Sequence, residues 1–209
     1  MTTFTASFSL TLDFAPFVLA RLPPPPARIL EIGCGSGELA RALSAARYEV
    51  IAIDPNAPEG EQFRRVSFED FDDPGPFDAV VASRSLHHIH DLGAALDKVR
   101  QLLGGDGVLV LDEFAWDQMD DATAEWYYRR RNEPVEGWRE RWNDEHDGLH
   151  TYDAMRGELD ERFRERSFAW LPYFYRDADL DIDVTEERLL IDEGAIRATG
   201  FRYIGEPLA

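Results

Sequence analysis

The segment most suggestive of chemistry runs from Glu31 to Gly37 and reads EIGCGSG. Its three glycines allow a sharp turn and let a ligand approach the backbone closely. A helical pattern begins directly after this loop, and the amides at a helix N-terminus favour an anionic group. Asp54 stands 21 residues after Gly33, at the end of the next apolar run, where a carboxylate can accept both hydroxyls of a ribose. The loop and this carboxylate predict a site for a nucleoside-containing cofactor.

The spacing of the glycines narrows the class of cofactor. The dinucleotide fingerprint is G-x-G-x-x-G, whereas Glu38 occupies the third glycine position here. A second carboxylate, Glu31, stands two residues before the first glycine. A carboxylate is repelled by a pyrophosphate but attracts an ammonium or a sulfonium. The loop therefore favours a cofactor with such a cation over NAD.

Three side chains near the predicted strand ends have nucleophilic or acid–base capacity. His87 and His88 follow an apolar run at 77–82, and histidine titrates near neutral pH. Each of them is a candidate for the acceptor site, and packing is the structural alternative for both. Cys34 has no neighbour in the sequence that would lower its pKa, so it is interpreted as a small buried loop residue.

A polar loop farther along the chain holds His146, His150 and Tyr152. Such a loop can line an acceptor pocket. A metal site is the alternative, but Gly148 disfavours the helix that would align the two histidines, so no metal is predicted. The catalytic residue stays open, with candidates His87, His150 and Tyr152.

Residues 114–180 contain all five tryptophans of the chain. They predict a small helical cap whose core is aromatic and which closes over an apolar or aromatic acceptor. The run 129–131 is all arginine, which suits a solvated helix face or, alternatively, recognition of a carboxylate or phosphate. The residues predicted to line the acceptor site are His87, His88, Trp116 and Tyr152.

The elements that position these residues alternate along the first half of the chain. Short apolar runs predict buried strands at 28–32, 49–53, 65–68, 77–82 and 107–111. Apolar residues at helical spacing predict helices at 12–22, 37–46 and 92–103. This alternation indicates a doubly wound α/β unit, with a parallel sheet covered by helices on both faces.

The second half departs from this rhythm. Two helices are predicted, at 117–131 and 151–164, and then a strand at 167–175. A helix at 185–198 that ends before Gly200, and a last strand within 201–206, complete the sheet. We interpret 1–209 as a single domain, with an N-terminal helix and proline-rich spacer at 1–27 and an aromatic-rich helical cap inserted at 114–166.

Charge and composition restrict the partners. The 209 residues include 41 Asp and Glu against 22 Lys and Arg, a formal net charge of −19, so a nucleic acid is not expected as a partner. The single cysteine excludes an intramolecular disulfide. No apolar run is long enough to cross a bilayer, and the N-terminus lacks a basic leader. A cytoplasmic protein without a membrane partner is expected, with its oligomeric state open.

The motifs resemble the class I S-adenosylmethionine-dependent methyltransferases of the small-molecule type. LEIGCGSG at 30–37 is similar to the first motif of that family, and Asp54 matches the acidic end of its second strand. FDAVVAS at 77–83, followed by LHHI at 86–89, looks like the fourth strand and its turn. LLGGDGVL at 102–109 looks like the glycine turn into the fifth strand. The resemblance implies a Rossmann-like, mostly parallel seven-stranded sheet, with the helical insert after the fifth strand as a departure from the family.

The resemblance also implies roles for individual residues. The loop would wrap the methionine part of S-adenosylmethionine, Asp54 would hold the ribose, and Pro55 would border the adenine. Asp70 would accept the adenine amino group beside the Phe71 amide, although a solvated acidic residue is an equal alternative there. The cofactor-binding residues implied are Glu31, Gly33, Cys34, Gly35, Gly37, Asp54, Pro55, Asp70, Phe71 and Ser83.

The resulting hypothesis is methyl transfer by in-line displacement from S-adenosylmethionine to a small-molecule acceptor beneath 114–175. The cofactor brings an activated leaving group, so the protein mainly positions the acceptor and excludes water. Two alternatives stay open: a protein that binds S-adenosylmethionine or S-adenosylhomocysteine without transferring a methyl group, and an NAD-dependent oxidoreductase.

Overall fold

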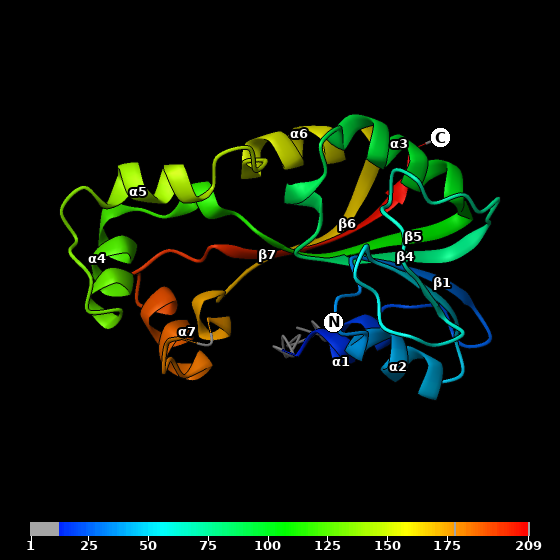
Figure 1. Cartoon of the computed structure of the whole chain (residues 1–209), viewed down its shortest axis with the longest axis horizontal. Helices are drawn as coiled ribbons and strands as arrows, with labels where there is room; N and C mark the ends of the chain where they lie inside the picture. The colour runs from blue at the N-terminus through cyan, green and yellow to red at the C-terminus, as the bar shows by residue number, and fades with distance from the viewer. Residues whose placement is uncertain (1–12, 178, 209) are drawn as a thin grey trace, which may run out of the picture.

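One seven-stranded sheet organises the chain, in the strand order β3-β2-β1-β4-β5-β7-β6 (Figure 1). The computed structural model describes residues 13–177 and 179–208. Strands β1 to β5 are parallel, and β7 runs antiparallel between β5 and β6. The strands are β1 (Arg28–Ile32), β2 (Glu49–Ile53), β3 (Phe63–Arg64), β4 (Phe77–Ser83), β5 (Leu103–Phe114), β6 (Phe163–Leu171) and β7 (Gly200–Pro207). This sheet confirms the predicted doubly wound, mostly parallel fold.

Helices cover both faces of the sheet and one of its ends. On one face lie α1 (Phe14–Leu19) and α2 (Glu38–Ala45), and on the other lie α3 (Leu92–Leu102) and α6 (Tyr152–Arg162) (Figure 1). The remaining helices are α4 (Asp121–Arg130), α5 (Trp138–Glu145) and α7 (Val184–Asp192), with short 3₁₀ turns η1 (Leu86–His88), η2 (Trp116–Gln118) and η3 (Phe174–Arg176). Among the described residues, no helix is long and apolar enough to cross a membrane.

The central strands are buried on both sides, as a covered parallel sheet requires. Neighbouring residues of a strand point to opposite faces. In β1, Ile29 therefore joins the apolar cluster beneath α1 and α2, while Leu30 and Ile32 join the cluster beneath α3. Glu31 lies between Leu30 and Ile32 at 5% exposure, so β1 carries a buried acidic side chain among apolar neighbours.

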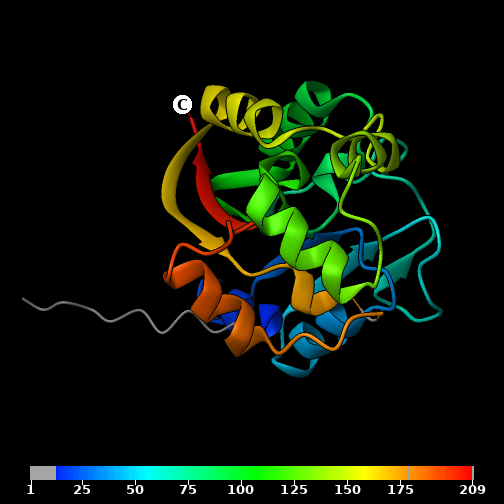
Figure 2. The ribbon, with the colours of Figure 1, turned by 90° about the vertical axis from the view of Figure 1, so that its left-hand side faces the viewer.

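A cap lies beyond the carboxyl ends of the central strands. It consists of α4, α5, η3 and α7 (Figures 1 and 2), and it has its own apolar cluster, in which Phe114, Tyr127, Trp142 and Phe174 are buried. Helix α6, in contrast, packs against α3 on the sheet. The aromatic residues of the insert thus form the core of a small subdomain at the strand ends, while the domain boundaries at 27 and at 114–166 stay predictions.

Several predicted elements differ from the structure. The strand expected at 65–68 is wrong: β3 is Phe63–Arg64, and the buried Phe68 lies in the turn that follows. The helix α5 was not predicted, because WRERWNDE presents only two apolar residues. Strand β6 begins four residues before the predicted strand and includes the last two residues of the predicted helix at 151–164.

Two helices are shorter than predicted. Helix α7 ends at Asp192 rather than near 198, because Gly194 adopts a left-handed φ of 71°, which terminates helices. Helix α1 spans Phe14–Leu19 within the predicted range 12–22, and Leu12 lies outside the described residues. Helix α1 packs beside α2 through the buried Phe17 and Val18, whereas α7 contacts η3 in the cap.

Candidate functional site: two cavities that meet at the end of strand β4

The glycine loop connects β1 to α2 through left-handed backbone. Gly33, Gly35 and Gly37 have φ values of 71°, 50° and 80°, which L-residues with a Cβ rarely adopt. The amides of Gly33 and Cys34 both donate to the carbonyl of Ile53, at 2.9 and 3.0 Å. A Cβ on Gly33 would collide with the side chain of Ser85, whereas one on Gly35 would meet nothing within 4 Å. The loop is thus held against β2, and its middle faces open space.

Asp54 connects the loop to the second strand. Its Oδ2 accepts from the Gly35 amide at 3.0 Å, and its Oδ1 accepts from the Asn56 amide at 2.7 Å. Both oxygens are therefore oriented by the backbone, and the carboxylate stays at the loop as predicted from the sequence spacing. A carboxylate held in this way can accept further hydrogen bonds, since each oxygen has a second lone pair.

Glu31 is the buried charge of the site. One of its carboxylate oxygens, Oε2, is buried and has no hydrogen-bond partner among the residues that the structure describes. Burial raises the pKa of Glu31 to about 8, the amide of Ala40 opposes this shift, and the charge of Asp54 adds to it. A buried acceptor without a partner is unfavourable, so a cation or a hydrogen-bond donor at this position would stabilise the carboxylate. An ammonium or sulfonium group fits that requirement.

Glu31 and the first residues of the loop line one cavity of about 400 Å³ at the carboxyl ends of β1 and β4, whereas Gly37 and Asp54 lie outside its lining. Burial raises the pKa of the Cys34 thiol to about 12, which keeps it neutral and unreactive. Arg84 lines the cavity on the side of β4. The predicted cofactor residues that line it are Glu31, Gly33, Cys34, Gly35 and Ser83.

The residues predicted for the adenine end lie outside this lining. Asp70 is exposed, and the hydroxyl of Ser67 donates to its carboxylate at 3.1 Å. The Phe71 amide donates to the Phe68 carbonyl at 3.3 Å within the same turn. Pro55 is exposed after β2. The roles of these three residues stay predictions.

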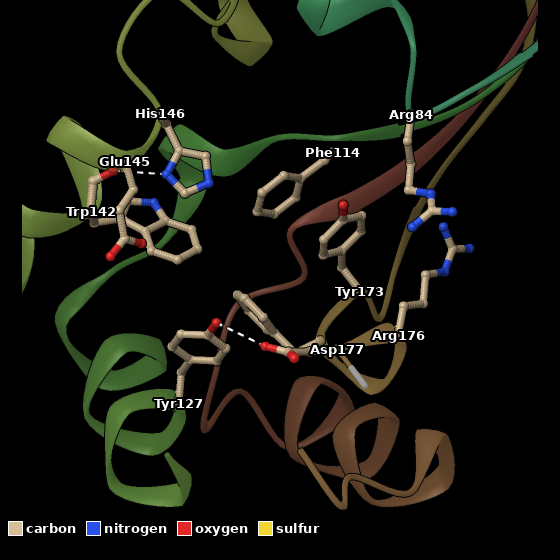
Figure 3. Close-up of a pocket in the computed structure, with 10 residues that line it drawn as sticks. Arg84, Phe114, Tyr127, Trp142, Glu145, His146, Tyr173, Arg176 and Asp177 are labelled. Atoms are coloured by element: carbon tan, nitrogen blue, oxygen red, sulfur yellow. Dashed lines mark hydrogen bonds between the residues drawn. The ribbon is translucent and has the colours of Figure 1, made fainter. Parts of the chain in front are cut away.

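A second cavity of about 380 Å³ lies beneath the cap (Figure 3). The Phe114 and Tyr173 rings stack with centroids 3.8 Å apart, and Trp142 meets the edge of Phe114. Arg84 and Arg176 line the opposite end from Glu145 (Figure 3). Because Arg84 also lines the first cavity, the two cavities meet at the end of β4.

His146 is the imidazole that lines this second cavity. Its Nδ1 lies 2.7 Å from the carbonyl of Trp142 (Figure 3). A carbonyl only accepts hydrogen bonds, so Nδ1 carries the proton and Nε2 keeps its lone pair. Burial lowers the pKa of His146, which favours the neutral ring. The arrangement leaves Nε2 able to accept a proton from a bound molecule.

Glu113, which sequence reasoning missed, holds the turn after β4. It is fully buried, and its Oε1 accepts from the amides of Ser85 and Leu86 at 2.8 and 2.7 Å. Its Oε2 lies 2.6 Å from Nδ1 of His87. The sequence did contain a signal for Glu113, because it is an acidic residue just after the predicted fifth strand. The carboxyl ends of the strands form the edge of a doubly wound sheet where ligands bind.

The other predicted catalytic and acceptor residues lie around the second cavity rather than in its lining. His88 lies with its ring centroid 4.2 Å from that of His87, and burial lowers the pKa of His88. Nε2 of His150 donates to the Ile89 carbonyl at 2.7 Å, and Nε1 of Trp116 donates to the His150 carbonyl at 3.0 Å.

Tyr152 packs away from the second cavity. Its ring lies 4.7 Å from Trp170 and 5.4 Å from Phe201, on the α3 and α6 face of the sheet. Burial raises the pKa of Tyr152. In the part of the chain that the structure describes, no three His, Cys, Asp or Glu side chains are arranged to hold a metal ion.

The fold and the loop together define the class of protein. A parallel sheet extended by an antiparallel seventh strand, with a glycine loop after β1 and an acidic residue after β2, is that of the class I S-adenosylmethionine-dependent methyltransferases. Residues 8–169 match the family model described as methyltransferase domain. The chain belongs to this family, and the resemblance predicted from its motifs is confirmed.

Relatives and solved structures agree with this assignment. The chain is 35% identical over 111 residues to the ubiquinone biosynthesis O-methyltransferase of Xanthomonas campestris pv. campestris, covering 46% of each protein. It thus spans less than half the length of such curated relatives. It resembles an S-adenosylmethionine-dependent methyltransferase from Mesorhizobium loti with a TM-score of 0.61 and 18% identity, over 91% of this chain and 96% of that one.

A further solved structure was determined with ligands. It is the 1,6-didemethyltoxoflavin-N1-methyltransferase of Burkholderia thailandensis with bound 1,6-didemethyltoxoflavin and S-adenosylhomocysteine. Its TM-score is 0.60 at 16% identity, over 93% of this chain and 76% of that one. At these identities both solved structures support the fold alone.

Proposed function

We propose that this protein transfers a methyl group from S-adenosylmethionine to a small-molecule acceptor. The observation that carries the proposal is the buried Oε2 of Glu31, which lacks a partner among the described residues and belongs to the cavity at the glycine loop. The cofactor has the cationic groups that such an oxygen requires. Its bound form supplies an activated methyl group and a neutral thioether leaving group.

The residues of the chain have separate tasks in this proposal. Glu31 attracts the cationic end of the cofactor, and the amides that orient Asp54 hold that carboxylate where ribose hydroxyls can donate to it. Asp70 and the Phe71 amide are proposed for the adenine. The ring stack of the buried Phe114 and the half-buried Tyr173 offers a flat apolar surface that positions the acceptor.

The acceptor cavity supports a transferase over a protein that only binds the cofactor. A protein without transferase activity needs no room beside the methyl group, whereas Arg84 borders both the loop cavity and the aromatic cavity. His146 lines the aromatic cavity with Nε2 available, so an acceptor that must lose a proton has a base within the same space.

The test is calorimetric titration of the full chain with S-adenosylmethionine, S-adenosylhomocysteine and NAD. We expect binding of the first two at micromolar concentrations and no binding of NAD. Asp54→Ala is expected to weaken both by about tenfold or more, since it removes hydrogen bonds to a charged group. Asp106→Ala, an exposed acidic residue in β5, is the matched control and should change nothing.

Two outcomes would contradict the proposal. Binding of NAD alone would assign the loop to an oxidoreductase. Unchanged affinity in Asp54→Ala would show that the cofactor does not lie at the glycine loop.

A further inference from the structure

The end of the aromatic cavity that faces the cofactor loop is cationic. The guanidinium groups of Arg84 and Arg176 point toward one another there (Figure 3). They do so in a chain with a net charge of −19, where acidic partners are abundant. Two guanidinium groups that face each other repel, and an anion bound between them would remove this repulsion.

Arg176 is held in place from behind. Its Nη1 and Nη2 donate to the two oxygens of Asp112, at 2.7 and 3.0 Å, and its Nε donates to the Tyr175 hydroxyl at 3.0 Å. Arg202 donates to the same Asp112 carboxylate at 2.8 Å. One buried carboxylate therefore accepts hydrogen bonds from both guanidinium groups and fixes the position of Arg176.

Arg84 adds a second positive charge. Its side chain interacts with that of Tyr173, and among the described residues no ion pair with a carboxylate is found for it. Its backbone is left-handed, with φ of 51°, a conformation that disfavours residues with a Cβ other than Asn and Asp. Strained residues of this kind are concentrated at functional sites. The position places the side chain at the junction of the two cavities.

The rest of the cavity suits a flat apolar body. The Phe114 and Tyr173 stack forms one wall, and the Tyr173 ring lies 5.7 Å from the Arg176 guanidinium carbon. Of the two acidic groups of the lining, Glu145 lies beside Trp142 at the other end, and Asp177 accepts from the Tyr127 hydroxyl and is paired with Arg131, each at 3.0 Å (Figure 3). A volume of about 380 Å³ is at the small end of ligand pockets, ~300–1,000 Å³.

We propose that the acceptor is a small aromatic molecule that carries a carboxylate or phosphate, and that Arg84 and Arg176 bind this anion. The ring lies against Phe114 and Tyr173, with its anionic group toward β4. Guanidinium groups suit carboxylate and phosphate because their donors match two oxygens at once. This inference rests on the proposed methyl transfer, because it names the acceptor of that same site.

The probes are benzoate, phenyl phosphate and the neutral benzyl alcohol. Binding of each to the full chain is followed by saturation-transfer NMR, with and without S-adenosylhomocysteine. We expect the two anions to bind at least about tenfold more tightly than benzyl alcohol, as a charge-assisted hydrogen bond predicts. The two anions also distinguish a carboxylate site from a phosphate site.

The variant Arg84→Asn removes the charge and suits the left-handed backbone. Arg47→Asn is the matched control, since Arg47 is an exposed arginine with φ of 71° outside both cavities. Arg84→Asn is expected to lose about tenfold in anion affinity, and Arg47→Asn is expected to lose none. Arg176 is not substituted, because it is part of the buried Asp112 cluster.

Four results would overturn the inference. They are equal binding of benzyl alcohol and the anions, no binding of any anion to the wild-type chain, anion affinity in Arg84→Asn equal to that in Arg47→Asn, and a loss of S-adenosylhomocysteine affinity in Arg84→Asn. The last result would assign Arg84 to the carboxylate of the cofactor. Failure of S-adenosylhomocysteine to bind the wild-type chain would contradict the methyltransferase proposal instead. The anion titrations do not require S-adenosylhomocysteine, so they still test the anion site in that case.

Discussion

The two cavities that meet at Arg84 are built in different ways. The cofactor cavity is lined mainly by the loop segment 31–39, with residues from the start of α1 and the end of β4, and Asp54 at the end of β2 is hydrogen-bonded to the loop. The aromatic cavity is made of side chains from β5, α4, α5 and η3, which are far apart along the chain. One site therefore depends on the local geometry of a loop, and the other depends on how several helices pack.

This difference predicts which property each region controls. Substitutions of the carboxylates at the cofactor loop should change binding with little loss of stability, because these side chains belong to none of the apolar clusters. Substitutions in the cap should change stability first, because its aromatic residues are both the wall of the cavity and the core of the subdomain. The variants below separate these two effects.

The largest effect is expected for Trp142→Ala. Trp142 is 4% exposed, meets the edges of Phe114 and Tyr127, and donates from Nε1 to the Trp116 carbonyl at 2.9 Å. Its removal should lower the free energy of unfolding by about 3–5 kcal/mol, measured by urea unfolding. The control is Trp170→Ala, since Trp170 is 40% exposed on β6. A loss of S-adenosylhomocysteine affinity in folded Trp142→Ala would show that the regions are coupled.

The next effect is expected for Glu31→Gln, which keeps the size of the side chain and removes its charge. Affinity for S-adenosylmethionine should fall by about tenfold to a hundredfold, since a charged partner is lost. Stability should not fall at neutral pH, because an acidic group without a hydrogen-bond partner at Oε2 is removed. Calorimetric titration measures these affinities. The control variant is Glu38→Gln, because Glu38 is an exposed residue that lines the same cavity. Equal losses of affinity in Glu31→Gln and Glu38→Gln would mean that the cofactor responds to the overall negative charge of the cavity and not to Glu31 in particular.

The pH dependence of cofactor binding is expected to be of intermediate size. The pKa of Glu31 is raised to about 8 by burial, so the carboxyl is protonated in the free protein at pH 6. Binding a cation requires its ionised form and releases a proton, so affinity should rise by about tenfold per pH unit toward pH 8. Titrations from pH 6 to 8 test this rise. A slope that persists in Glu31→Gln would assign the proton to another group.

The same raised pKa has a consequence for stability. A carboxyl whose folded pKa lies above its unfolded value contributes stability below the unfolded pKa, and that contribution is lost as pH rises toward about 8. The wild-type chain should therefore lose stability relative to Glu31→Gln between pH 5 and 8, which thermal unfolding measures. Parallel stability curves would contradict the burial of this charge.

The smallest effect concerns the junction of the two cavities. Arg84→Asn should raise the free energy of unfolding by about 0.5–1 kcal/mol, because Asn tolerates the left-handed backbone better than Arg. Arg47→Asn should give a similar gain, since its backbone is alike. Urea unfolding compares the two. A loss of stability in Arg84→Asn alone would show that Arg84 has a structural partner rather than a binding role.

Predictions from sequence were most accurate where a single pattern specifies an element. The runs at 28–32 and 49–53 match β1 and β2 residue for residue, because a strand buried on both faces is a continuous apolar run. Strand β3 has only two residues and therefore no periodicity to detect. Helix α5 is mostly charged, and only its two buried tryptophans mark it.

The candidate site also has a part that could be predicted from the sequence and a part that could not. The sequence by itself determined the central strands β1 and β2 and the places of the glycine loop, Glu31 and Asp54 at their ends, because each depends on residue types at short, fixed spacings. The tertiary structure alone decided that Arg84, His146 and Arg176 line one cavity, and that Glu113 holds His87. These contacts join segments up to about ninety residues apart, and their geometry comes from the packing of the cap on the strand ends, which no local pattern encodes.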